Sequence, residues 1–202
     1  MEKEASKSLV KEPDLSYGKY SYADYLTWEM EEMVELIKGK IFKKTAAAPR
    51  RIHQWLTGNL YTEMNLFLKG KKCQAYIAPF DVRLPVKSKK DEHIHTVVQP
   101  DICVVCDLEK LDDKGCVGAP DLVVEVLSPG NKQMELQRKY EVYEESGVKE
   151  YWIVDPEGKT VLIYTLTQGK YSASRWMTEG DVARSSVIPG FELDLDEFFK
   201  DA

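Results

Sequence analysis

Two carboxylates stand in strand-like apolar runs of this sequence. Asp101 opens the run Ile102–Val105, and Glu125 lies in the middle of the run Leu122–Leu127. A carboxylate that is buried without a partner costs several kcal/mol, so each of these needs a cation, strong hydrogen bonds or a metal. Because neither run contains a cationic residue, the pair favours a divalent metal site. Carboxylate oxygens suit Mg²⁺ or Mn²⁺.

A second interpretation needs no metal. Each carboxylate would then form a salt bridge or lie at the end of a strand. Lys139 is a candidate partner, because it lies at the border of the apolar face of a predicted helix over 131–146. A lysine in that position also commonly extends its ammonium into solvent. The two roles of Lys139 stay open at this stage.

The elements that must position these residues follow from periodicity and turn signals. In the first part of the chain we expect a helix over 22–30, a hairpin of 34–37 with 40–43 and a helix from Pro49 to Gly70. Strands over 76–84, 97–106 and 121–127 follow, and then a helix over 131–146. The chain is expected to end with strands over 151–154, 160–166 and 171–177 and with a last strand or short helix within 191–199. The runs 122–127 and 151–154 read as buried central strands joined by a right-handed helical crossover. The predicted class is therefore α/β, with helices against a sheet.

Composition limits the function classes. The chain has 202 residues and a formal net charge of -6, which excludes a globally basic protein that coats nucleic acid but not a local basic groove. We expect a mobile tail over 1–20 and a single domain over 21–202. No apolar run approaches the roughly 20 residues of a membrane span, and the charged start lacks a signal sequence.

Four cysteines are too few for a disulfide scaffold. Cys103 and Cys106 lie in one predicted strand, where residues three apart point to opposite faces. We therefore expect both to be buried small hydrophobes and not a metal-binding or redox pair. A reducing, cytoplasmic location fits this interpretation.

Several stretches resemble one family. The strongest runs from Gln99-Pro100-Asp101 to Asp121–Pro129, and others are Val34–Ile41, His53, Lys139-Tyr140, Gly147–Pro156 and Pro189-Gly190-Phe191. Over residues 21–199 the chain resembles the Uma-type family, described as putative restriction endonucleases, within the PD-(D/E)XK nuclease superfamily. The resemblance implies a restriction-endonuclease-like fold, with a central mixed β-sheet flanked by helices and additional hairpins.

The resemblance also implies site residues for a Mg²⁺-dependent endodeoxyribonuclease. Asp101 resembles the motif aspartate, and Glu125 resembles the acidic residue of the second motif. That motif expects a lysine where Leu127 stands, and Lys139 is the matching position in families whose lysine lies on the next helix. We expect Asp101, Glu125 and the Val126 carbonyl to hold Mg²⁺ or Mn²⁺, while Lys139 orients the nucleophile or stabilises the phosphorane.

Other residues have two interpretations each. Glu35 resembles an accessory acidic residue, or is an exposed hairpin glutamate. His53 contacts a phosphate or a metal-bound water, or is a structural histidine. Asp81 and Asp121 either supplement the site or are charges at strand edges, and the second interpretation is favoured. Two histidines make a poor zinc site, so His93 and His95 are expected to be exposed.

Three function classes follow. The favoured one is a DNA endonuclease, expected to be a homodimer because duplex cleavage suits two-fold symmetry. Its candidate DNA-contacting residues are Lys43, Lys44, Arg50, Arg51, Lys132 and Arg138. The alternative is a catalytically degenerate module on the same fold that binds DNA or protein, which Leu127 would favour. A small-molecule phosphohydrolase is disfavoured, because Gly115 and Gly118 form no phosphate-cradling loop.

Overall fold

The computed structural model describes residues 13–16, 18–29, 33–43, 51–128 and 133–202. They fall into two compact units, one built from residues up to 45 together with 83–98, and the other from residues 46–82 and 99–202. Most of the expected mobile tail lies outside the described residues. No helix of the described ranges is long and apolar enough to span a membrane.

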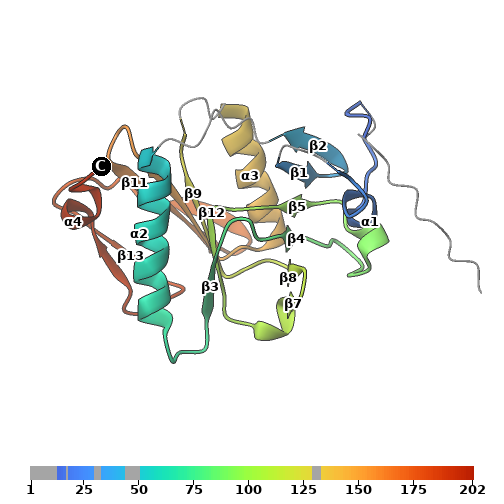
Figure 1. The fold of residues 1–202 in the computed structure, drawn as a ribbon. Coiled ribbons are helices and arrows are strands. Elements are labelled where there is room, and N and C mark those ends of the chain that lie inside the picture. Colours follow the sequence, from blue (N-terminus) through green and yellow to red (C-terminus); the bar gives the residue numbers. More distant parts are fainter. Residues whose placement is uncertain (1–12, 17, 30–32, 44–50, 129–132) are drawn as a thin grey trace, which may run out of the picture. The chain divides into compact units, whose positions relative to one another are not determined.

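The larger unit contains a mixed six-stranded sheet in the order β12-β11-β10-β9-β6-β3 (Figure 1). Its strands are β3 (Gln74–Ile77), β6 (Ile102–Val105), β9 (Leu122–Val126), β10 (Glu150–Asp155), β11 (Thr160–Thr167) and β12 (Lys170–Ala173). β9 and β10 are parallel, and the other neighbouring strands are antiparallel. The expected α/β class with a mixed sheet is confirmed.

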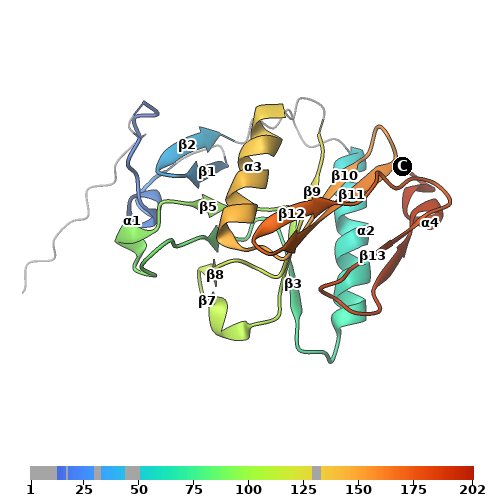
Figure 2. The same ribbon diagram turned by 180° about the vertical axis from the view of Figure 1, so that it is seen from behind.

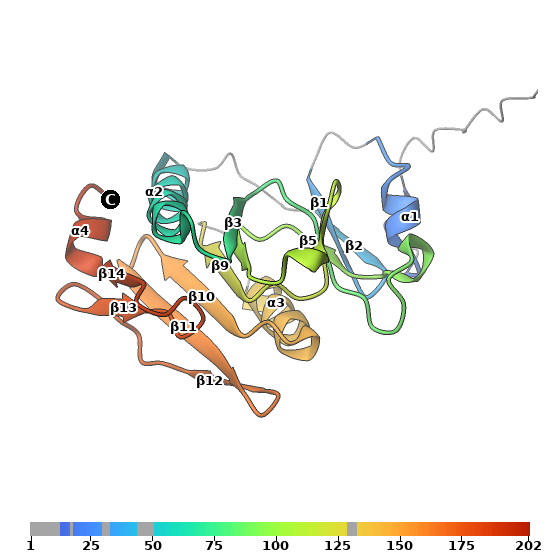
Figure 3. The same ribbon diagram turned by 90° about the horizontal axis from the view of Figure 1, so that it is seen from below.

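Helices cover both faces of this sheet, as Figures 1 and 2 show from opposite sides. On one face α2 (Arg51–Leu68) and α4 (Leu195–Phe199) pack with the main apolar core, which includes Leu60, Val124 and Trp152. On the other face lies α3 (Gln133–Ser146), the expected connection between parallel strands β9 and β10. Because side chains alternate along a strand, Val124 faces α2 while Glu125 faces α3. Viewed from below in Figure 3, β9, β10 and β11 lie side by side.

The larger unit also contains two small antiparallel hairpins. One pairs β7 (Leu111–Asp112) with β8 (Gly115–Val117), inside a segment that the sequence predicts as a loop and that begins with the short helix η2 (Leu108–Lys110). The other pairs β13 (Val182–Arg184), which the sequence does not predict, with β14 (Glu192–Asp194). The segment 191–199, expected as a strand or a short helix, is both: β14 leads directly into α4.

The smaller unit contains α1 (Tyr22–Tyr25), the hairpin of β1 (Val34–Ile37) and β2 (Lys40–Lys43), the short helix η1 (Asp91–His93) and β5 (Val97–Val98). β5 pairs with β1, and the hairpin bounds agree with the prediction. Tyr22, Leu36 and Ile94 belong to its apolar core. The Ser21–Asp24 capping box is confirmed as well.

Three predicted elements are shorter or broken. α1 stops at Tyr25, and Thr27 just beyond it donates both its backbone N–H and its Oγ1 to the Asp24 carbonyl. The predicted strand 76–84 is split into β3 and β4 (Val82–Arg83), and the strand 97–106 into β5 and β6. Pro79 and Pro100 lie in these gaps, where each lacks the N–H that a ladder requires. The expected helix starts at Pro49 and Asn131 lie outside the described residues.

The expectation for Cys106 is wrong. Cys106 is bonded to Cys73 in a disulfide, and both residues are half-buried. The prediction compared Cys106 only with its sequence neighbour Cys103, whereas antiparallel pairing of β3 with β6 brings Cys73 beside Cys106. Cys103 is buried, as expected, Cys116 is buried as well, and neither forms a disulfide.

Candidate active site

Asp101 and Glu125 lie next to each other on adjacent strands. Ile102 of β6 pairs with Val124 of β9 in antiparallel register, so Asp101 and Glu125 are the next residue on each side of that pair. The backbone supports the link, since the Val126 N–H donates to Asp101 Oδ2 over 2.8 Å. The sheet therefore places the backbone of these two predicted site residues side by side.

Glu125 is buried and hydrogen-bonded to two residues of α3. Lys139 Nζ and the Tyr143 hydroxyl each donate to Glu125 Oε1 over 2.8 Å. Residues i and i+4 of a helix share a face, which is why both reach one oxygen. Lys139 is 2% exposed. A charge held this deeply requires a partner, and the ammonium and the carboxylate supply it for each other.

Lys139 therefore lies at the site and does not extend into solvent. The alternative in which its ammonium is a surface charge is wrong. Leu127 donates its backbone N–H to the Val154 carbonyl, directly after the β9–β10 pairing. A cation thus approaches Glu125 from α3, although β9 itself carries none.

Asp101 is also contacted from α2. His53 Nε2 lies 3.3 Å from Asp101 Oδ2, the oxygen that accepts the Val126 N–H. His53 Nδ1 is buried and has no hydrogen-bond partner among the described residues. α2 thus directs His53 Nε2 toward the Asp101 carboxylate, while His53 Nδ1 has no protein partner among the described residues.

Two tyrosines, Tyr143 and Tyr151, lie near Glu125. The ring of Tyr143 packs edge-on against Tyr151, with centroids 5.0 Å apart. Burial raises the pKa of Tyr151 well above its ordinary value, and the neighbouring Glu125 charge raises it further, so its hydroxyl stays protonated. Sequence periodicity identifies Tyr143 only as an inner-face residue. The hydrogen bond from Tyr143 to Glu125 depends on how α3 packs against β9, which no local sequence pattern predicts.

Glu35 lies in β1 of the smaller unit and is 3% exposed. The alternative of an exposed hairpin glutamate is therefore wrong. Its accessory role in the site stays a prediction.

Asp121 forms a separate cluster at the start of β9. Its Oδ1 accepts a bond from Lys149 Nζ over 2.6 Å, and its Oδ2 accepts the Cys106 N–H. Burial by itself raises the pKa of Asp121, but the bonds from Lys149 and Cys106 outweigh it and the pKa lies below the ordinary value. Asp121 is therefore a charge at a strand end, as expected.

The remaining candidates behave as ordinary polar residues. Asp81 Oδ1 accepts a bond from Gln99 Nε2 over 2.7 Å. His93 and His95 are both exposed, as expected, and their Nδ1 atoms lie within hydrogen-bond distance of Ser88 Oγ and the Tyr20 carbonyl. Over the described ranges, no group of three or more His, Cys, Asp or Glu side chains is placed to hold a metal ion.

Most of the chain is similar to known proteins. Residues 22–196 match the model of the Uma2 family, whose description is putative restriction endonuclease. The chain belongs to the Uma2 family. The resemblance found in the sequence is thereby confirmed.

Two individual proteins extend the comparison. An uncharacterized protein, slr1290, from Synechocystis sp. is 24% identical over 159 residues, which cover 77% of this chain and 79% of that protein. A crystal structure of a putative nuclease belonging to DUF820, from Anabaena variabilis, superposes with a TM-score of 0.68 at 21% identity. The match covers 90% of this chain and 98% of the other. At that identity the match shows that the two proteins share the fold.

Proposed function

We propose that this Uma2-family chain is a metal-dependent endonuclease that hydrolyses phosphodiester bonds in DNA. The observation that carries the proposal is the buried contact of Lys139 with Glu125, with Asp101 beside it on the next strand. A carboxylate pair with a fixed lysine is one set of groups that can support metal-dependent phosphodiester hydrolysis. The family description and the nuclease fold of the Anabaena protein support the same class of reaction.

The donor set fits Mg²⁺ or Mn²⁺. Asp101 and Glu125 offer carboxylate oxygens on adjacent strands, and the Val126 carbonyl is the third proposed ligand. Mg²⁺ binds through one or two carboxylates and keeps several waters, so a protein-only cage is not needed. When bound, the ion would neutralise charge on the phosphate and acidify a water.

The residues of the chain would divide the work as follows. Asp101 and Glu125 hold the ion, and Lys139 orients the nucleophile or stabilises negative charge that develops on the phosphate. Because Tyr143 and Lys139 both bind Oε1, the orientation of the Glu125 carboxylate is fixed before substrate arrives. His53 holds Asp101 from α2 and would contact a phosphate of the substrate.

DNA would be bound by basic side chains through its phosphates. Arg51 and Lys43 are exposed and Arg138 is half-buried, whereas Lys44, Arg50 and Lys132 lie outside the described residues. With a net charge of -6, binding should weaken steeply with salt. We further propose a homodimer, which suits cleavage of both strands. The cytoplasmic location stays a proposal, but the Cys73–Cys106 disulfide removes the cysteine argument for it.

The test is cleavage of supercoiled plasmid in Mg²⁺, in Mn²⁺ and in EDTA. We expect nicked and linear products with either metal, none in EDTA, and none from Asp101→Asn or Glu125→Gln. Glu150→Gln is the matched control, because Glu150 is a fully buried glutamate of the neighbouring strand that binds Trp152 and Ser186 instead.

Two results would contradict the proposal. One is cleavage that persists in EDTA or in Glu125→Gln. The other is DNA binding without cleavage under every condition, which would favour the catalytically degenerate module.

A further inference from the structure

The Cys73–Cys106 disulfide lies at the edge of the larger sheet, apart from the proposed catalytic residues. Cys73 immediately precedes β3 and Cys106 immediately follows β6, so the bond joins the paired ends of these two strands. β3 is the last strand in the sheet order. The bond therefore fastens an edge strand at one end, where fraying would otherwise begin.

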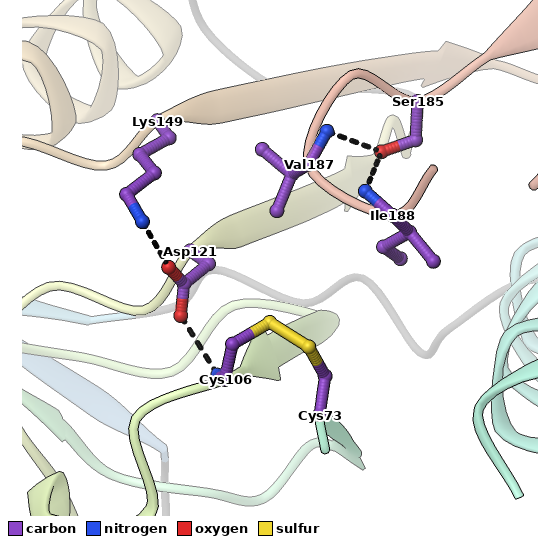
Figure 4. The surroundings of a disulfide bond; sticks show 7 residues. All are labelled: Cys73, Cys106, Asp121, Lys149, Ser185, Val187 and Ile188. Carbon is purple, nitrogen blue, oxygen red and sulfur yellow. Dashed lines mark hydrogen bonds and ion pairs between the residues drawn. A yellow bond between two sulfur atoms is a disulfide. The ribbon is translucent and has the colours of Figure 1, made fainter. Parts of the chain in front are cut away.

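The sulfurs lie at an open pocket. Cys73 and Cys106 line a cavity of about 470 Å³ together with Asp121, Lys149, Thr165, Leu166, Ser186 and Val187. Figure 4 shows the bond beside Asp121, with Lys149 beyond it and the Ser185–Ile188 loop opposite. The Lys149 side chain is 66% exposed, which confirms that solvent reaches this part of the pocket. Both cysteines are half-buried, and this pocket is the side from which a small thiol would approach the disulfide.

The other two cysteines are protected from such chemistry. Cys103 and Cys116 are buried, and burial raises the pKa of the Cys103 thiol far above its ordinary value. Since the thiolate is the reactive form, neither competes for exchange at neutral pH. The fold thus separates one accessible pair from two inert thiols.

We propose that Cys73 and Cys106 form a reversible thiol–disulfide exchange site whose partner is a dithiol reductant. A thiolate of the reductant attacks one sulfur, the Cys73–Cys106 bond breaks, and the other cysteine leaves as a thiolate that takes a proton. The second thiol of the reductant then attacks the mixed disulfide and releases the first cysteine. The protein gains two electrons and two protons, and the reductant becomes a disulfide.

Reduction would loosen β3 and leave the unit folded. β3 keeps four paired positions with β6, and Ala75 stays in the main core with Leu56 and Leu60 of α2. Asp121 continues to hold the Cys106 backbone through its N–H. The freed end is therefore Cys73 and the start of β3.

The experiment uses the whole native chain, with dithiothreitol as the dithiol, N-ethylmaleimide as the label and mass spectrometry as the readout. Before reduction we expect a cross-linked peptide joining Cys73 and Cys106. After native reduction we expect loss of that peptide and labelling of both residues, while Cys103 and Cys116 stay unlabelled. Removal of dithiothreitol and addition of oxidised glutathione should restore the cross-link.

Hydrogen exchange supplies the second readout. Residues 74–77 should lose protection on reduction and in Cys73→Ser/Cys106→Ser, while β9 and β10 keep theirs. The proposal is overturned if the bond resists dithiothreitol until denaturant is added, if all four cysteines become labelled together, or if the pair stays reduced in oxidised glutathione. None of these readouts depends on DNA cleavage.

Discussion

Glu125 Oε1 accepts two hydrogen bonds from one helix face, and this shared contact is the clearest chemical feature of the molecule. The strand sequence alone indicates that a buried carboxylate at position 125 needs a partner, and α3 provides Lys139 as that partner. Tyr143 could not be identified in advance, because a tyrosine on an inner helix face is equally consistent with apolar packing. The same limit applies to Cys73, whose partner is fixed by strand register and not by spacing.

Tyr143→Phe tests the hydroxyl contact with Glu125. We expect the free energy of unfolding to fall by about 2 kcal/mol, because a hydrogen bond to a charged group is lost. Tyr171→Phe is the control, since Tyr171 donates to the neutral Val148 carbonyl and should cost about 1 kcal/mol. Urea denaturation of the variants measures both values. Equal losses would show that the contact with Glu125 contributes nothing beyond an ordinary hydrogen bond.

Asp121 provides a pH-dependent contribution to stability. Its pKa in the folded protein is below the ordinary value of 3.8, so its contribution is fully present above that value and is lost as pH falls through the folded pKa. We expect the stability difference between the wild type and Asp121→Asn to be constant from pH 7 to about 5 and to shrink in acid. Urea midpoints across this range measure it. A difference that grows in acid would contradict the assignment.

At the scale of helices and strands, the sequence predicts those elements that depend on local patterns, such as turn residues and apolar runs. The β1–β2 hairpin follows from an apolar run, a Lys38-Gly39 turn and a second run, and its bounds agree with the prediction. The predicted strands 76–84 and 97–106 are each broken in two. The apolar sequence pattern continues across Pro79 and Pro100, but the backbone hydrogen-bond ladder cannot, because proline has no N–H. β7 and β8 are missed because they are short and lie in a charged segment, where pairing depends on a close backbone contact.

Gly115 makes that contact, and Gly115→Ala tests it. A Cβ there would lie 2.3 Å from the Asp81 carbonyl oxygen, and φ is +125°. Gly169 also has a positive φ, of +78°, but a Cβ would meet nothing within 4 Å. We expect Gly169→Ala to cost about 1 kcal/mol from backbone conformation, and Gly115→Ala to cost clearly more. Thermal unfolding of the pair measures the difference, and equal losses would rule out the contact.

At the scale of the whole molecule, topology assembles the candidate site. Asp101 immediately precedes β6, Glu125 lies in β9, Lys139 and Tyr143 lie in α3, and His53 lies in α2. The mixed sheet places α2 and α3 on opposite faces, so His53 approaches Asp101 from one side and Lys139 approaches Glu125 from the other. The net charge of -6 is compatible with this arrangement, because part of the excess is carboxylate proposed to hold a cation.

The most direct test of the central proposal is the single-turnover rate of DNA cleavage by Lys139→Met in Mg²⁺. The proposal gives Lys139 the role of the lysine expected at position 127. The cleavage rate of Lys139→Met should then fall by about 10²- to 10³-fold, while its affinity for DNA is unchanged. Lys149→Met is the matched control, since Lys149 pairs with Asp121 at the other end of β9, and it should cleave at the wild-type rate. Both variants are compared at a temperature at which circular dichroism shows them folded. A Lys139→Met variant that cleaves as fast as the wild type would contradict the proposal.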